Sequence, residues 1–362
     1  MQRRIFIKQS ALITGGVGLL GYGCSSNTTQ GDSEDGENSG AVATSATPES
    51  LFKISLAEWS FHNAMFNPAL SNVPWPERDK YYDSNYEFII ADSKLSNMDF
   101  PQKAADMGFE GVEFVNQFFY NKAEDTQYLA ELKRACENAG VQAVLIMCDR
   151  EGALGDPDEA ARTKAVENHY KWVDAAKYLG CHSIRVNAQS EGSYEEQQKL
   201  AADGLSRLGE YASNAGINVI VENHGGLSSN GEWLAGVMKM VGKDGVGTLP
   251  DFGNFCIKRV YPTPENPNPG CEEEYDRYKG VEELMPYAKS VSAKTHDFNE
   301  QGEETHTDYE KMMRIVLDNG YRSFVGVEYE GSGLSEEEGI MKSKQLLEKV
   351  REKLASEYQT QS

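Results

Sequence analysis

From Lys53 onward, short runs of β-branched residues alternate with longer amphipathic segments, and eight such pairs can be counted along the chain. Consecutive strand and helix patterns of this kind are typical of a parallel sheet whose strands are joined by crossover helices. The predicted strands cover 54–59, 111–114, 142–148, 183–187, 218–222, 247–251, 292–296 and 324–329. Eight units in succession predict a single-domain α/β fold, a (β/α)8 TIM barrel.

Several predicted helices are followed by a glycine that stands immediately before the next strand, as at Gly140, Gly180 and Gly216. Glycine accepts the left-handed conformation in which many helices end more easily than other residues do. These glycines therefore mark helix-to-strand junctions at regular intervals, which supports the prediction of eight units.

The first 50 residues do not share this pattern. Arg3 and Arg4 precede an apolar stretch at 11–23 that is too short to span a bilayer, which indicates an export signal peptide over residues 1–24. The paired arginines resemble the bacterial twin-arginine signal, and Cys24 stands where a lipoprotein is lipidated. The alternative is a soluble periplasmic protein that is cleaved nearby. Residues 25–50 are polar or small, which predicts a disordered linker before a barrel over 51–358.

The composition restricts the partners of the chain. Asp and Glu outnumber Lys and Arg by 57 to 35, which gives a formal net charge of −22, and no basic cluster offsets it. Such a charge repels a nucleic acid backbone, so we exclude nucleic acid as a partner. Contact with a membrane is expected only through a lipid at Cys24, and the formation of a homo-oligomer is left open.

Two stretches, 62–93 and 257–280, are longer than a barrel requires. Both follow the carboxyl end of a strand, so both are expected to rise over the mouth of the barrel, as a lid, a binding insertion or a surface decoration. Cys256 and Cys271 bracket a proline-rich part of the second stretch. We hypothesise that these two cysteines pair in an oxidising compartment.

The last four predicted strands each end in a residue that can bind a metal, namely Glu222, Asp251, His296 and Glu328. The carboxyl ends of barrel strands meet at one mouth, so these side chains are expected to converge there. Three carboxylates would repel one another severely unless a cation lay between them. Oxygen ligands with one nitrogen favour Mn²⁺, with Mg²⁺, Co²⁺ and Zn²⁺ as alternatives. The sequence therefore predicts one divalent metal ion at the mouth.

These four segments resemble those of the sugar phosphate isomerase/epimerase family, whose members are xylose isomerase-like TIM barrels. The resemblance implies that the four residues bind one metal, which chelates a carbonyl and a neighbouring hydroxyl of a sugar. It implies that Glu222 and Glu328 are catalytic and flank the carbon that loses and regains a proton, through an enediolate intermediate. The implied substrate is a small-molecule sugar or, for an exported protein, a glycoside.

One position departs from the tagatose-type 3-epimerases of that family. Those enzymes carry a histidine three residues after the metal-binding Asp, where this chain has Asn254. An amide can hydrogen-bond a sugar hydroxyl but cannot take up a proton near neutral pH, so 3-epimerase activity does not transfer directly. The candidate substrate-binding residues are Asn254, His62, Glu113, Arg185, His224 and Lys294.

We expect a metal-dependent sugar isomerase or epimerase. The close alternative is a lyase or dehydratase of 3-keto-sugars or keto-glycosides, because an enolate with a leaving group in the β position can eliminate it. A sugar-binding lipoprotein without catalysis would not need two Glu residues across a metal. The metal-dependent endonucleases of the same superfamily use several His ligands, and the high negative charge argues against that class.

Overall fold

The computed structural model describes residues 50–260 and 270–358, and its centre is a sheet of eight parallel strands. The strands are β1 (Lys53–Ala57), β2 (Gly111–Val115), β3 (Gln142–Met147), β4 (Ser183–Val186), β5 (Asn218–Glu222), β6 (Val246–Leu249), β9 (Val291–Thr295) and β10 (Phe324–Tyr329). Their order is β6-β5-β4-β3-β2-β1-β10-β9. The eight predicted strands are all present, and the prediction of a TIM barrel is confirmed.

The two edge strands, β6 and β9, meet without forming a continuous ladder. Isolated parallel bridges join Thr248 to Ala288 and Asp251 to Ser292 instead. Around Asp251, the Ser292 N–H donates to the carbonyl of Pro250 at 2.9 Å, and the Phe252 N–H donates to the carbonyl of Ser292 at 3.0 Å. The sheet thus curls until its edges touch at these few points.

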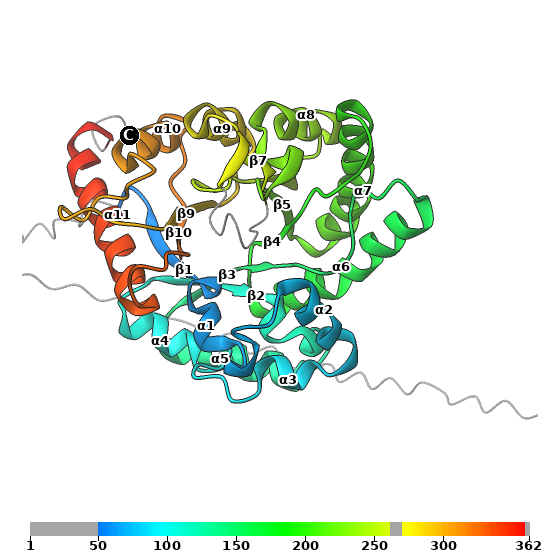
Figure 1. The fold of residues 1–362 in the computed structure, drawn as a ribbon, viewed down its shortest axis with the longest axis horizontal. Helices are drawn as coiled ribbons and strands as arrows, with labels where there is room; N and C mark the ends of the chain where they lie inside the picture. The colour runs from blue at the N-terminus through cyan, green and yellow to red at the C-terminus, as the bar shows by residue number, and fades with distance from the viewer. Residues whose placement is uncertain (1–49, 261–269, 359–362) are drawn as a thin grey trace, which may run out of the picture. The chain divides into compact units, whose positions relative to one another are not determined.

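Helices cover the outside of the strands (Figure 1). They are α4 (Phe100–Asp106), α5 (Thr126–Ala139), α6 (Glu159–Leu179), α7 (Tyr194–Ala215), α8 (Gly231–Val241), α9 (Arg277–Leu284), α10 (Tyr309–Asp318) and α11 (Glu336–Tyr358). Short 3-10 helices occupy Glu58–Phe61, Pro68–Leu70, Asn116–Phe118, Tyr120–Lys122, Gly226–Ser229 and Met285–Tyr287. Helix α7 begins with a capping box between Ser193 and Glu196 and is capped at its carboxyl end by Gly216, whose φ of 75° is left-handed.

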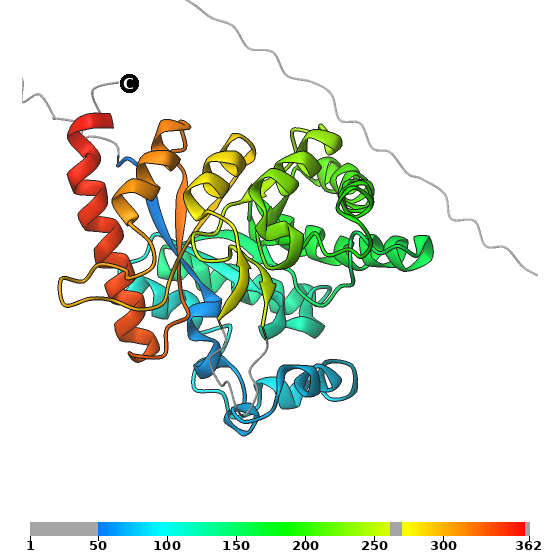
Figure 2. The same cartoon turned by 45° about the horizontal axis from the view of Figure 1, so that its top comes forward.

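Both long stretches contain elements of their own. The first holds α1 (His62–Met65), α2 (Trp75–Ser84) and α3 (Tyr86–Ile90), which lie together beyond the sheet in Figure 2. The second holds an antiparallel hairpin of β7 (Cys256–Arg259) and β8 (Cys271–Glu274). A disulfide joins Cys256, the first residue of β7, to Cys271, the first residue of β8, in agreement with the hypothesis from the sequence.

The predicted signal peptide, Cys24 and all but the last residue of the predicted linker lie outside the described residues. Within the described ranges, every helix is too short or too polar to cross a membrane.

Candidate active site

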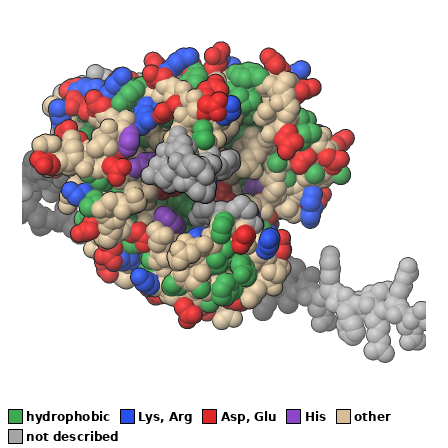
Figure 3. All heavy atoms as spheres, viewed as in Figure 1, with side chains coloured by type: hydrophobic (Ala, Val, Ile, Leu, Met, Phe, Trp, Pro, Cys, Tyr) green, Lys and Arg blue, Asp and Glu red, His purple; other side chains and the backbone are tan. Residues whose placement is uncertain are grey.

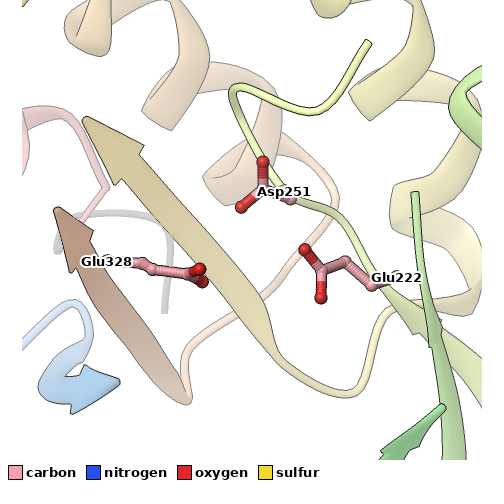
Figure 4. A group of neighbouring side chains, drawn as sticks. All are labelled: Glu222, Asp251 and Glu328. Atoms are coloured by element: carbon pink, nitrogen blue, oxygen red, sulfur yellow. The ribbon is translucent and has the colours of Figure 1, made fainter. Parts of the chain in front are cut away.

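Three buried carboxylates meet at the carboxyl ends of the strands. Glu222 is the last residue of β5, Asp251 follows β6, and Glu328 lies near the end of β10. None of the three side chains is more than 5% exposed. One oxygen from each carboxylate lies within 4.8 Å of the other two, and Figure 4 shows the three groups pointing toward one another.

Neutral hydrogen-bond donors hold these carboxylates in place. The Ser292 hydroxyl lies 2.6 Å from Asp251 Oδ2 and 3.2 Å from Glu328 Oε2. Asn254 Nδ2 donates to Glu222 Oε1 at 2.8 Å, while its backbone N–H donates to Asp251 Oδ1 at 2.8 Å. These bonds fix the orientation of all three acids without neutralising their charge.

His296, the fourth predicted ligand, does not lie with the three carboxylates. Its side chain is 38% exposed, and Nε2 lies 4.0 Å from Glu330 Oε2. The register of the sheet explains this position: Lys294 is the residue directly opposite Glu328, and β9 ends at Thr295. His296 stands two residues beyond Lys294, roughly 6.6 Å farther along the chain, above the layer of the acids.

Lys294 occupies the place beside the carboxylates that was predicted for His296. Its Nζ lies 3.1 Å from Glu328 Oε1, 3.4 Å from Glu330 Oε1 and 3.9 Å from Asp251 Oδ2, and the side chain is 1% exposed. Burial alone would lower the pKa of Lys294, but the surrounding carboxylates raise it well above its ordinary value. The amine is therefore a fixed positive charge.

Arg185, on β4, is the second buried cation. Its Nη1 lies 2.7 Å from Asp149 Oδ1, and its Nε lies 2.9 Å from Glu222 Oε2. The Nε–H is not aimed at that oxygen, so neither atom has a hydrogen-bond partner among the described residues. Burial opposes ionisation of Asp149, but Arg185 outweighs it and holds the pKa of Asp149 far below the ordinary range.

Two of the three acids resist ionisation. Burial, together with the neighbouring charge of Glu222, raises the pKa of Glu328 to about 8 even though Lys294 opposes the shift. Burial likewise raises the pKa of Asp251 to about 6 against the effect of Lys294. The site thus concentrates more negative charge than its own cations compensate.

The donor set fits a divalent metal as a three-oxygen site. Carboxylate oxygens are the ligands that Mg²⁺ and Mn²⁺ prefer, and the spacing of the three groups allows one ion to contact all of them. Glu222 Oε2, which is buried and accepts no hydrogen bond, is available as a ligand. A nitrogen ligand from His296 is missing from this set.

A cavity of about 1080 Å³ opens above the acids. Of the six predicted substrate-binding residues, five line it: His62, Arg185, His224, Asn254 and Lys294. In Figure 3, histidine side chains border the depression in this face. Glu113 does not line the cavity: it is fully buried in the barrel, where it accepts a hydrogen bond from Ser55 at 2.6 Å. Burial raises the pKa of Glu113 to about 7.

Sequence reasoning missed three residues of the site. Asp149 pairs with Arg185, Glu330 pairs with Lys294, and Ser292 bridges two acids. The alternation of side chains along β9 was the available signal for Ser292, because it places Ser292 and Lys294 on the same face. Asp149 stands two residues after the end of β3, but β3 is not one of the four strands on which the prediction of the site rested.

Comparison with known proteins identifies one family and several solved structures that share the fold of this chain. A family model described as "Xylose isomerase-like TIM barrel" matches residues 101–350. Among curated proteins, none matches this chain. A 3-keto-D-glucoside 4-epimerase from E. coli has 16% identity and a TM-score of 0.55, and the match covers 70% of this chain and 94% of that one.

Two further structures match over more of the chain. A D-tagatose 3-epimerase-like protein has 16% identity and a TM-score of 0.58, with 84% of this chain and 99% of that one covered. A xylose isomerase-like TIM barrel protein from Mycobacterium smegmatis in complex with magnesium has 16% identity and a TM-score of 0.55, with 84% and 97% covered. At these identities, the structural matches show a shared fold.

Proposed function

The chain belongs to the xylose isomerase-like TIM barrel family, and from this premise we propose that it is a sugar isomerase or epimerase that removes and returns a proton next to a carbonyl. The convergence of Glu222, Asp251 and Glu328 at the mouth of the barrel is the observation that carries the proposal.

The proposal assigns distinct tasks to the residues of the site. A divalent ion held by the three carboxylates, Mn²⁺ or one of the alternatives Mg²⁺, Co²⁺ and Zn²⁺, would supply a Lewis acid for the negative charge that develops on sugar oxygens. Glu328 lines the cavity and Glu222 presents an oxygen without a hydrogen-bond partner, so these two acids are the proposed carriers of the proton. Lys294 and Arg185 line the same cavity and can donate to sugar hydroxyls.

The comparisons support the epimerase side of the proposal. One similar fold belongs to a 3-keto-D-glucoside 4-epimerase and another to a D-tagatose 3-epimerase-like protein. No finding favours the lyase alternative. A keto-sugar or keto-glycoside is the substrate class that we propose to test first, because its carbonyl acidifies the neighbouring C–H bond.

We also propose that the protein is exported and carries a lipid at Cys24. The disulfide between Cys256 and Cys271 supports export, because such bonds persist mainly in oxidising compartments.

Incubation of the metal-loaded protein with keto-sugars and keto-glucosides in deuterium oxide tests the reaction. We expect solvent deuterium at one carbon of an epimerised or isomerised product, detected by NMR and mass spectrometry. Glu222→Gln and Glu328→Gln should each abolish this exchange, whereas the exposed control Glu337→Gln should not. Wild-type exchange in either site variant would refute its assignment, and an unsaturated product or a released aglycone would identify a lyase.

A further inference from the structure

We infer that Lys294 takes the place of a fourth metal ligand, so that this site binds a divalent cation more weakly than its three carboxylates alone would. The inference rests on the metal site of the proposed function and concerns how that site is regulated. It predicts that the ammonium group of Lys294 and the metal compete for the same negative charge.

The amine of Lys294 lies within the proposed ligand set of the metal. Lys294 Nζ contacts Glu328 at 3.1 Å and lies 3.9 Å from Asp251, and both carboxylates belong to the proposed ligand set. The register places Lys294 directly beside Glu328, so the side chain reaches the acids without leaving the inner face of β9. A cation bound by both acids would therefore have a fixed positive charge as its neighbour.

Burial makes this competition strong. Lys294, Asp251 and Glu328 are each at most 5% exposed, so little water screens the repulsion between an ammonium group and a divalent ion. Glu330 also contacts Lys294, at 3.4 Å, and takes up part of the charge. Its side chain is 28% exposed, so it is the more strongly screened partner.

The same amine serves the protein without metal. Three buried carboxylates need a compensating cation, and Lys294 provides one from within the chain. Arg185 compensates less at the acids, because it also pairs with Asp149 at 2.7 Å. In the metal-free protein, Lys294 therefore supplies the positive charge that a site with four metal ligands would obtain only from the bound metal.

Lys294→Met tests the inference, because Met removes the charge while keeping an unbranched side chain. Mn²⁺ binding is measured by isothermal titration calorimetry and by electron paramagnetic resonance, without sugar, after treatment with chelator. We expect Lys294→Met to bind Mn²⁺ at least about tenfold more tightly than the wild type, as the loss of a buried like charge requires. Lys258→Met is the matched control, since Lys258 lines the same cavity but pairs with exposed Glu272.

Each outcome of the Mn²⁺-binding experiment either supports or overturns the inference. Unchanged or weaker Mn²⁺ binding in Lys294→Met overturns the inference, and so does a variant that stays unfolded in saturating Mn²⁺. A variant that folds only with Mn²⁺ supports it, because the metal then replaces the lost cation. Lys294→Arg, which keeps the charge, should retain the weak binding of the wild type. Failure of the proposed function would appear separately, as proton exchange that survives Glu222→Gln and Glu328→Gln.

Discussion

Replacement of Glu328 by Gln should make the metal-free protein more stable at alkaline pH while removing a proposed catalytic group. Burial raises the pKa of Glu328 to about 8 in the folded protein, against an ordinary value of 4.5. The folded state therefore holds this proton more tightly than the unfolded chain does. The resulting stability is fully present below pH 4.5 and is lost as the pH rises through 8.

The size of the effect follows from these two values. Between pH 6 and pH 8 the unfolded chain is ionised throughout, while the folded protein has to give up the proton. One unit of pH is worth about 1.4 kcal/mol over this range, so ionisation of Glu328 alone should cost the wild type about 2 kcal/mol of unfolding free energy. Glu328→Gln has no proton to lose at this position, so its decline should be smaller than that of the wild type by about 2 kcal/mol. Glu58, with a pKa of about 8, and Glu113, with a pKa of about 7, contribute to the decline of both proteins. Asp251, with a pKa of about 6, adds its own contribution mainly below this window.

Urea denaturation in the presence of chelator at pH 6, 7 and 8 measures this dependence. The exposed variant Glu337→Gln should follow the wild type, and saturating Mn²⁺ should remove from the wild type the part of the decline that Glu328 causes. The reasoning is refuted if the wild-type free energy is constant from pH 6 to pH 8, or if Glu328→Gln declines as steeply.

Three further predictions use other parts of the structure. Asn254→Ala removes the 2.8 Å hydrogen bond to Glu222, and we expect kcat to fall about tenfold or more with little change in KM, measured by steady-state kinetics. Gly326→Ala would place a Cβ 2.4 Å from Glu113 Oε1, so unfolding free energy should drop by about 1–3 kcal/mol in urea titrations. Dialysis against chelator should abolish deuterium exchange into substrate, and Mn²⁺ should restore it; exchange that persists without metal would contradict metal dependence.

Much of the fold was predictable because the sequence patterns are local. Buried parallel strands are continuous apolar runs, and glycine marks the ends of helices such as α6 and α7. The predicted last strand at 324–329 coincides with β10. Contacts between neighbouring residues determine such features, so one stretch of sequence is enough to identify them.

The membership of the site was harder to predict, because it depends on register. His296 and Lys294 are both inward candidates at the end of β9, and only the pairing with β10 shows that Lys294 faces Glu328. The prediction that β9 ends at His296 was one residue too long. A shift of one or two residues along a strand decides whether a side chain joins the acids or stands above them.

Because only a few bridges join β6 to β9, a molecule bound at the mouth can change the stability of the contact between these two edge strands. Asp251 and Ser292 form one of those bridges, and Glu222 and Glu328 stand on the strands next to the two edges. Any metal or sugar that contacts Asp251 and Glu328 together ties the edges to each other. Binding at the mouth should therefore slow hydrogen exchange of the amides at both edges, so that occupancy of the site and closure of the barrel become one event.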